Sequence, residues 1–275
     1  MTDMTTSPIS APKSPAEIDA VFGDGTTKDP ALAPSQTARE EWRRFARYVK
    51  RPVLPDAMAR RSDAVSGTLR MLGLDLAIMT VFIGTLMLIV AAGFDLPENL
   101  NSTLDMNMTT VLLVVVLAPL LEEAVFRSWL SGRPRYLGAF AALLAAGVIA
   151  AIAGASVGGD TGTAIGGLAV LAGLVAAVVA MVLLWKRQPP GWFRTAFPVL
   201  FWLSSLAFSL VHLMNYTEGA LYVLLPLVIP QLILGTMAAY VRVQFGLIFA
   251  ILLHALHNGF ALSLAALAMS AGMES

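Results

Sequence analysis

The stretch Leu121-Glu122-Glu123-Ala124-Val125-Phe126-Arg127 places two adjacent carboxylates inside an apolar run from about Thr109 to Leu130. A charge near the centre of a bilayer costs at least about 2.5–3.5 kcal/mol, so acids inside such a run are candidates for function. On a helix the two glutamates point about 100° apart, which predicts different roles. Glu123 and Arg127 are four residues apart with the acid first, the favoured order for a helical ion pair. Glu122 is left without a local partner.

The composition of the whole chain predicts an all-α protein with several membrane-spanning helices. Of its 275 residues 57% are hydrophobic and 13% are charged, and the mean hydropathy is +0.74. A soluble domain carries about 25% charged residues, roughly twice as many. The sequence has no cysteine. Disulfides, thiolate metal sites, cysteine nucleophiles and lipidation on cysteine are therefore excluded.

Three regions follow from the distribution of residue types. Residues 1–35 are rich in Pro, Ser, Thr, Ala and Asp and show no periodicity, which predicts a disordered tail. Residues 36–70 are interpreted as an interfacial amphipathic helix and a linker. Residues 71–275 form the predicted transmembrane domain, with apolar runs long enough, or nearly so, to cross about 30 Å of hydrocarbon.

The interfacial helix is predicted between Gln36 and Arg51. Trp42, Phe45 and Val49 lie near one face of that helix and basic residues occupy its other faces. Such a pattern is typical of a helix lying on an anionic membrane surface. An ordinary solvated helix is the alternative.

The transmembrane domain is expected to be a bundle of about seven membrane helices, with eight as the alternative. The third and fourth apolar runs are dense in Ala, Gly, Val and Leu and contain no charged residue, so they are expected to be packing helices without chemistry. The seven predicted spans are residues 72–94, 109–130, 137–157, 163–185, 196–214, 219–241 and 246–271.

Basic residues predict the orientation of these spans. Eleven of the 18 Lys and Arg precede the first span, and the others lie on the same side in a seven-span arrangement. The opposite loops, DLPENLNSTLDMN, GASVGGDTG and NYTEG, contain none. The positive-inside rule then places the N-terminus in the cytoplasm.

All three histidines lie within or beside apolar runs in the last third of the chain. His212 is late in the fifth span, whereas His254 and His257 lie in the seventh. Asn258 follows His254 by four residues, so the two share a helix face, while His257 is offset. The rise along each helix places Glu122, His212 and His254 within about 10 Å of one another in depth. Polar groups in membrane helices turn inward, which predicts one shared cavity.

These motifs resemble those of the CPBP intramembrane proteases, the CAAX-processing and bacteriocin-protection relatives also called the Rce1-type or ABI family. The resemblance consists of Glu-Glu-x-x-x-Arg, Phe-x-x-x-His and His-x-x-x-Asn in that order on separate membrane helices. It implies an integral membrane peptidase, of the bacterial inner membrane, that acts on peptides or membrane proteins, including lipid-modified ones, and not on nucleic acid. The matching residues are Glu122, Glu123, Arg127, Phe208, His212, His254 and Asn258.

One departure from the family pattern concerns the spacing of the motifs. About 85 residues separate the glutamate motif from Phe-x-x-x-His, where the resemblance implies roughly one helical hairpin. The third and fourth spans therefore appear as an insertion. Two extra spans keep the sidedness of the later helices, so the site is compatible with them.

The resemblance implies an endopeptidase in which Glu122 is the general base that activates water. His212 would help to hold that water, and His254 and Asn258 would donate hydrogen bonds to the tetrahedral oxyanion. Glu123 and Arg127 are expected to be a structural pair, with Glu123 as a candidate second acid. Phe208 is expected to pack beneath the site.

Metal participation stays open at the level of sequence. Glu122, His212 and His254 could supply the His₂Glu set of a catalytic zinc ion, and His257 could replace either histidine. The His-Glu-x-x-His motif of ordinary zinc proteases is absent from the sequence. A Zn²⁺-dependent mechanism and a metal-free glutamate mechanism are therefore equally compatible with the residues.

The remaining polar residues allow other interpretations. Ser156 lies in Gly154-Ala155-Ser156-Val157-Gly158, which matches the serine-hydrolase elbow pattern, but that motif requires a strand before the serine. Asp75 and Gln231 are single polar residues in spans one and six, where interhelical hydrogen bonding is expected, with Gln231 as a candidate cavity residue. The alternative functions are a small transporter or proton relay and a catalytically silent membrane scaffold.

Overall fold

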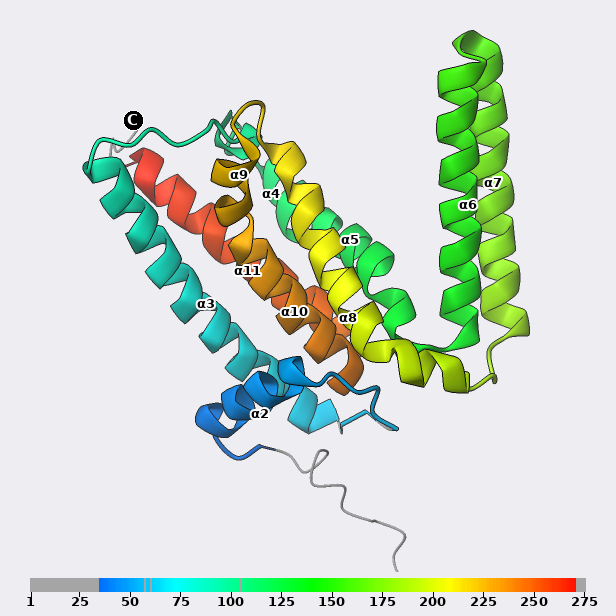
Figure 1. Cartoon of the computed structure of the whole chain (residues 1–275), viewed down its shortest axis with the longest axis horizontal. Helices are drawn as coiled ribbons and strands as arrows, with labels where there is room; N and C mark the ends of the chain where they lie inside the picture. The colour runs from blue at the N-terminus through cyan, green and yellow to red at the C-terminus, as the bar shows by residue number, and fades with distance from the viewer. Residues whose placement is uncertain (1–34, 57, 60, 104, 271–275) are drawn as a thin grey trace, which may run out of the picture. The chain divides into compact units, whose positions relative to one another are not determined.

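The computed structural model describes residues 35–56, 58–59, 61–103 and 105–270, and within these ranges the regular elements are helices (Figure 1). Residues 1–34 of the expected disordered tail lie outside the described residues. The elements are α2 (Ala38–Lys50), α3 (Arg61–Ala91), η1 (Leu100–Thr103), α4 (Met108–Val111), the π-helical segment η2 (Leu112–Leu117), α5 (Ala118–Phe126), η3 (Ser128–Ser131), α6 (Pro134–Ser156), α7 (Gly159–Leu183), α8 (Gly191–Val211), η4 (His212–Asn215), α9 (Leu221–Leu227), α10 (Ile229–Gln244) and α11 (Leu247–Ser270).

The prediction of a polytopic helical bundle is confirmed. Six helical segments of the described chain are long and apolar enough to cross a membrane, and they correspond to predicted spans one to five and seven. The predicted sixth span is a pair of helices, α9 and α10, bent by 43° at Val228. Pro226 and Pro230 flank this bend. Proline lacks an N–H and breaks helical hydrogen bonding, which accounts for the break.

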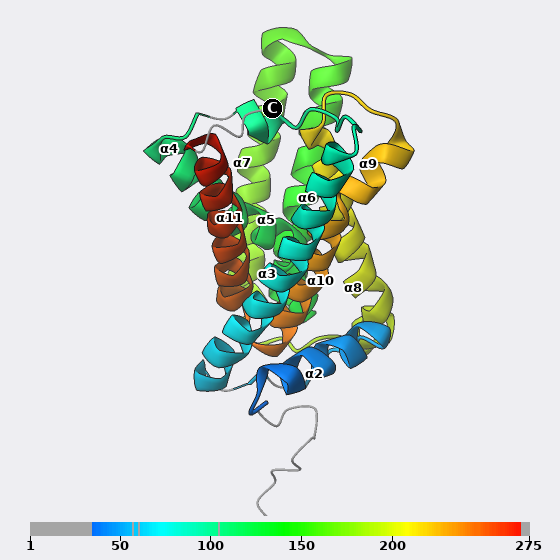
Figure 2. The same ribbon diagram turned by 90° about the vertical axis from the view of Figure 1, so that its left-hand side faces the viewer.

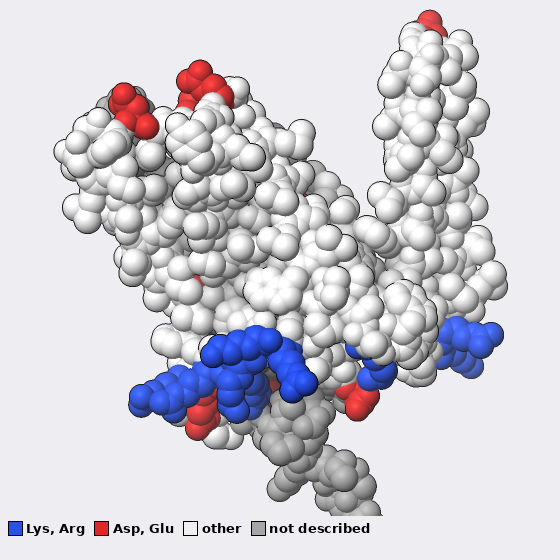
Figure 3. Space-filling view, viewed as in Figure 1, with Lys and Arg blue, Asp and Glu red and all other residues white. Residues whose placement is uncertain are grey.

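Lysines and arginines are confined to one end of the bundle in the view of Figure 3, near α2 and where α7 and α8 meet. Acidic side chains are visible at both ends, and the opposite end shows no lysine or arginine. This arrangement is the one that the loop composition predicts. The cytoplasmic location of the basic end remains a prediction from the positive-inside rule.

Helices α6 and α7 pair along their length through small residues (Figures 1 and 2). A Cβ atom added at Gly173 would lie 2.4 Å from the Ala146 Cβ, and one at Gly162 would lie 2.7 Å from the Ala153 carbonyl oxygen. Backbones therefore approach closely, as expected for small-residue packing between membrane helices. Their glycines and alanines carry no reactive group, in agreement with a packing role.

The apolar face of α2 packs against the protein. Phe45 and Tyr48 are buried and make edge contacts with the Tyr240 ring of α10. Trp42 donates through Nε1 to the Arg70 carbonyl, 2.7 Å away, and the buried Glu41 accepts from the Tyr240 hydroxyl at 2.5 Å. The apolar face of α2 is therefore covered by α10 and its neighbours, and the location of α2 at a membrane surface remains a prediction.

The core lies at the basic end of the bundle, between α2, α3, α8, α10 and α11. One face of α8 supplies a series of fully buried phenylalanines at helical spacing. Met71 of α3, Met237 of α10 and Leu253 of α11 are buried in the same cluster. This cluster fixes α8 and α11 against each other and so positions the polar residues that follow along both helices. The phenylalanines are Phe193, Phe197, Phe201 and Phe208.

Candidate active site

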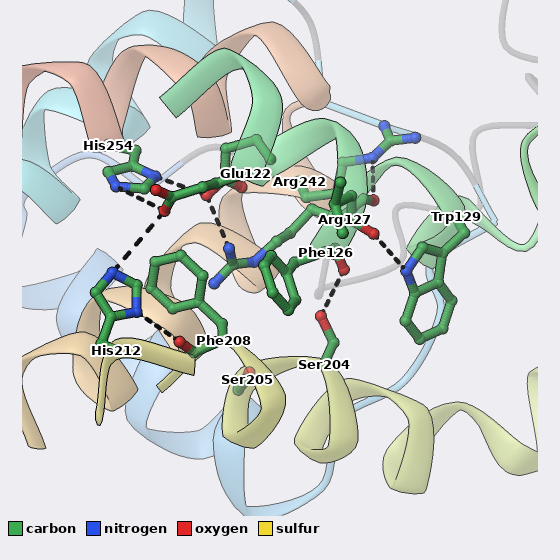
Figure 4. A network of polar contacts seen from close by, with 12 residues as sticks. Glu122, Phe126, Arg127, Trp129, Ser204, Ser205, Phe208, His212, Arg242 and His254 are labelled. Atoms are coloured by element: carbon green, nitrogen blue, oxygen red, sulfur yellow. Dashed lines mark hydrogen bonds and ion pairs between the residues drawn. The ribbon is translucent and has the colours of Figure 1, made fainter. Parts of the chain in front are cut away.

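Three helices bring Glu122, His212 and His254 to one point (Figure 4). Glu122 lies in α5, His212 directly follows α8, and His254 lies in α11. The Glu122 Oε2 atom is 3.9 Å from the His212 Nε2 atom and 3.8 Å from the His254 Nε2 atom. All three line a cavity of about 380 Å³, together with Asn258. The inserted pair of spans therefore does not separate His212 from Glu122.

The hydrogen bonds of the two imidazoles define which atoms face Glu122. His212 Nδ1 is 2.7 Å from the Phe208 carbonyl oxygen, and His254 Nδ1 is 2.9 Å from the Glu123 Oε1 atom. A carbonyl and an ionised carboxylate only accept, so both Nδ1 atoms carry hydrogen. In the neutral rings each Nε2 then presents a lone pair towards Glu122. The Glu122 Oε2 atom and the two Nε2 atoms are thus all acceptors. Each Nε2 atom lies farther from Glu122 Oε2 than the length of a hydrogen bond.

Glu123 connects the ion pair to the histidine. Its Oε1 atom lies 2.9 Å from Arg127 Nη1 and 2.9 Å from His254 Nδ1, and both Glu123 and Arg127 are fully buried. The ion pair predicted from the four-residue spacing is thus present. The sequence did not indicate the second contact, which fixes the tautomer and the orientation of His254 in the way that carboxylate partners orient histidines elsewhere.

The buried Arg127 is held between a ring and a glycine. Its guanidinium carbon lies 3.8 Å from the centroid of the Phe208 ring, which also contacts His212 at 4.7 Å between centroids. Phe208 thus packs beneath the cluster, as expected. A Cβ atom at Gly235 of α10 would lie 3.1 Å from Arg127 Nη2 and 3.1 Å from the Phe208 ring. Only a residue without a side chain leaves the guanidinium undisturbed.

Asn258 has a structural hydrogen bond in addition to its place in the cavity. Its Nδ2 atom donates to the Val114 carbonyl at 2.9 Å. In the π-helical segment the Ala118 N–H donates to Leu113. Pro119, which would be the next donor in this register, has no N–H. Asn258 therefore supplies the donor that the helix lacks, and one amide hydrogen of Asn258 remains for another acceptor.

The other polar residues of spans one, six and seven have separate arrangements. His257 Nδ1 lies 2.6 Å from Asp75 Oδ2, which joins α11 to α3 and confirms the interhelical contact predicted for Asp75. His257 lines the cavity but the structure does not bring it into the Glu122 cluster. Gln231 also lines the cavity, and its side-chain oxygen is buried without a hydrogen-bond partner. The interhelical hydrogen bond expected for that oxygen is not formed.

The end of the glutamate helix is fixed by side chains from α8 and α10. Arg242 donates to the carbonyl oxygens of Arg127 and Ser128 at 3.0 and 2.8 Å, and Ser204 donates to Phe126 at 2.6 Å. These bonds satisfy carbonyls that a helix end leaves unpaired. The sequence indicated neither role, because the partners are far apart along the chain.

The spacing of the Glu122 oxygen and the two imidazole nitrogens differs from that of ligands around a zinc ion. Glu122, His212 and His254 supply zinc-type donor atoms, but these lie 3.8 and 3.9 Å apart, whereas a tetrahedral zinc site places neighbouring donors about 3.4 Å apart. Within the described part of the chain, no group of three His, Asp or Glu residues is arranged to hold a metal ion. A tetrahedral zinc ion would therefore require these donors to move closer together by a few tenths of an ångström.

The serine-hydrolase pattern has the wrong structural context. Ser156 is the last residue of the membrane helix α6, so a helix and not a strand precedes it. The three histidines lie in η4 and α11. Ser156 is therefore not part of the cluster around Glu122.

Comparison with known proteins identifies the family. Residues 105–260, more than half of the chain, match the family described as Type II CAAX prenyl endopeptidase Rce1-like. The comparisons with curated proteins and with solved structures gave no match. The matched region extends from the loop before α4 to the middle of α11 and contains Glu122, His212, His254 and Asn258. The chain belongs to the Type II CAAX prenyl endopeptidase Rce1-like family.

Proposed function

We propose that the protein is an intramembrane endopeptidase in which Glu122 activates water for attack on a peptide bond. The observation that carries this proposal is the convergence of the Glu122 carboxylate and two imidazole Nε2 atoms within 3.9 Å in one cavity. The family also implies a peptidase. Three acceptor atoms around one point suit a water molecule, because water can donate two hydrogen bonds and transfer a proton.

In the proposed reaction Glu122 accepts a proton from the attacking water as the new C–O bond forms. The proton then moves to the leaving nitrogen as the C–N bond breaks, which returns Glu122 to its carboxylate form. His212 holds the water through its Nε2 atom. The fixed Nδ1 bonds keep both rings in the required orientation, so little reorganisation accompanies the reaction.

Stabilisation of the tetrahedral oxyanion requires hydrogen donors. Asn258 has one amide hydrogen left beside its bond to Val114. His254 can donate to the oxyanion through Nε2 only in its protonated form, with the Glu123 carboxylate at Nδ1 as its counterion. We therefore assign Asn258 and the His254–Glu123 pair to the oxyanion side of the reaction.

The cavity lining is compatible with an extended peptide substrate. Its walls combine apolar residues from α3, the loop before α4, η2, α5, α10 and α11 with the amides of Asn101, Asn215 and Gln231. The unpaired Gln231 oxygen offers an acceptor for a backbone N–H of the substrate. We propose a membrane-associated peptide, with prenylated C-terminal peptides as the substrate class that the family description suggests.

The test is cleavage of a prenylated CAAX-type peptide by the purified protein in detergent. Glu122→Gln is expected to reduce the rate by about 10²–10⁴-fold, the usual contribution of a general base. Glu98→Gln, an exposed carboxylate outside the cavity, is the matched control and should keep the wild-type rate. Wild-type cleavage by Glu122→Gln would exclude the proposed base. Proton flux in liposomes that depends on Glu122, without cleavage, would instead favour a transporter.

A further inference from the structure

A second cavity lies at the basic end of the bundle, where the α6–α7 hairpin joins the remaining helices. Its volume is about 170 Å³, equivalent to several water molecules at about 30 Å³ each. The lining comes from the linker between α2 and α3, η3, the start of α6, the linker between α7 and α8, the start of α8 and the end of α10. We call it the basic pocket. It is lined by Leu54, Pro55, Asp56, Met58, Ser131, Arg133, Arg135, Tyr136, Gln188, Pro189, Arg194, Arg242 and Val243.

The charge of the basic pocket is strongly unbalanced. Its lining contains four arginines but a single carboxylate, that of Asp56. This carboxylate is already paired with Arg194 at 2.7 Å, and its side chain is 86% exposed. Three positive charges of the lining therefore have no carboxylate among the lining residues. Like charges this close repel one another, so an anion in the pocket would relieve the repulsion.

Arg135 is held in place with one donor unused. Its guanidinium carbon lies 4.1 Å from the centroid of the Trp185 ring and 4.5 Å from that of Tyr136. Its Nη2 atom donates to the Tyr136 hydroxyl at 3.0 Å, whereas its Nε atom is buried without a hydrogen-bond partner. Buried donors are nearly always satisfied, so the unused Nε–H indicates a missing acceptor.

The shape and position of these donors favour a phosphate group. Planar guanidinium groups match the oxygens of phosphate better than ammonium groups do. The pocket lies at the end of the bundle where lysines and arginines gather (Figure 3). Basic pockets between transmembrane helices bind phospholipid head groups on the cytoplasmic side of a membrane, where the positive-inside rule places this end. We propose that the basic pocket binds the phosphate group of an anionic membrane phospholipid.

Such a lipid would connect the hairpin to the helix that carries Glu122. Arg133 and Arg135 flank the first residue of α6, while Arg242 donates to the carbonyls that follow α5. One phosphate between these arginines would bind both parts of the molecule. Lipid binding in the basic pocket does not depend on the proposed peptidase reaction.

The experiment measures phosphatidylglycerol binding to the detergent-purified full-length protein by native mass spectrometry, with phosphatidylcholine as the neutral lipid. The wild-type protein is expected to bind phosphatidylglycerol in preference to phosphatidylcholine. Arg133→Gln combined with Arg135→Gln should weaken phosphatidylglycerol binding about 30-fold, since each basic residue contributes to attraction of an anionic head group. Arg39→Gln combined with Arg43→Gln removes the same charge from the exposed face of α2 and should weaken binding much less, because neither arginine lines the pocket.

An opposite change keeps the test independent of folding. Asp56→Asn removes the only carboxylate of the lining and leaves Arg194 without its ion pair, so it is expected to tighten phosphatidylglycerol binding. Because the Asp56 side chain is largely exposed, the substitution should not impair folding. Asp160→Asn, at the far end of the hairpin, is the matched control and should have no effect. Equal binding by wild type and all four variants would overturn the proposal. Displacement of the lipid by inorganic phosphate at matched concentration would also overturn it, in favour of free phosphate.

Discussion

Glu123 and His254 form a buried hydrogen bond of 2.9 Å across 131 residues of sequence. The same Glu123 oxygen lies 2.9 Å from Arg127 Nη1, so one carboxylate joins the cation of its own helix to the imidazole of α11. The two adjacent glutamates thereby acquire different functions. Glu123 determines how His254 is held, and Glu122 faces the cavity with its Oε2 atom unpaired.

Substitution of Glu123 should impair both folding stability and cleavage. Glu123→Gln removes the countercharge of the fully buried Arg127, and breaking a buried ion pair costs about 3–5 kcal/mol. Glu122→Gln, by contrast, should lose cleavage while keeping wild-type stability, because the Glu122 Oε2 atom accepts no hydrogen bond within the described part of the chain. Thermal unfolding in detergent and the peptide assay separate the two effects. Equal stability of Glu123→Gln and wild type would contradict the proposed role of the pair.

Gly235 is expected to tolerate no side chain. A Cβ atom there would lie 3.1 Å from both Arg127 Nη2 and the Phe208 ring, so Gly235→Ala should destabilise the protein by about 1–3 kcal/mol. The helical Gly84 has no atom within 4 Å of its added Cβ, which makes Gly84→Ala the matched control. Thermal unfolding in detergent measures the difference. A stable Gly235→Ala variant would mean that Arg127 and Phe208 shift readily.

The hydrogen bond from Asn258 to Val114 predicts a coupling with Pro119. Asn258→Ala leaves a carbonyl without its donor, which should cost about 1–3 kcal/mol of stability. Pro119→Ala restores an N–H to the helix and should recover much of that loss in the double variant. A double-mutant cycle measured by thermal unfolding tests the coupling. Independent, additive effects would show that proline is not the reason for the Asn258 bond.

Ser156→Ala is expected to leave cleavage unchanged. The serine ends α6 at the opposite end of the hairpin from the residues that join it to the core, and it is exposed. The peptide assay with the purified variant measures this directly. A loss of activity without a loss of stability would revive the serine-hydrolase interpretation.

Metal removal should not abolish cleavage. The described donors lie further apart than in a tetrahedral zinc site, and the proposed reaction needs only Glu122, the histidines and Asn258. Metal analysis of protein purified without added zinc should find less than one equivalent, and EDTA should leave the rate intact. Inactivation by EDTA with recovery on addition of Zn²⁺ would require a different mechanism.

Features that depend on neighbouring residues could be predicted from the sequence. The apolar runs predicted the membrane helices, and the four-residue spacing predicted the Glu123–Arg127 pair, since both are set within one helix. The ordered motifs indicated the family, which the match to residues 105–260 confirms. The distribution of Lys and Arg predicted the charge difference between the ends of the bundle that Figure 3 shows.

Contacts between distant helices were not predictable in this way. The amphipathic pattern of α2 did not indicate that Phe45 and Tyr48 pack on Tyr240, because such a pattern does not distinguish lipid from protein as the partner of an apolar face. The bond between Asn258 and Val114 depends on the local break that Pro119 imposes on a different helix.

The sequence by itself therefore determined the class of protein, the membrane helices and the candidate residues of the active site. Only the tertiary structure decided that Glu123 orients His254, that Gly235 makes room for Arg127, and that four arginines surround one pocket. The physical reason is that hydropathy and helical spacing act along one segment. Hydrogen-bond partners and excluded volume, in contrast, depend on how separate helices pack.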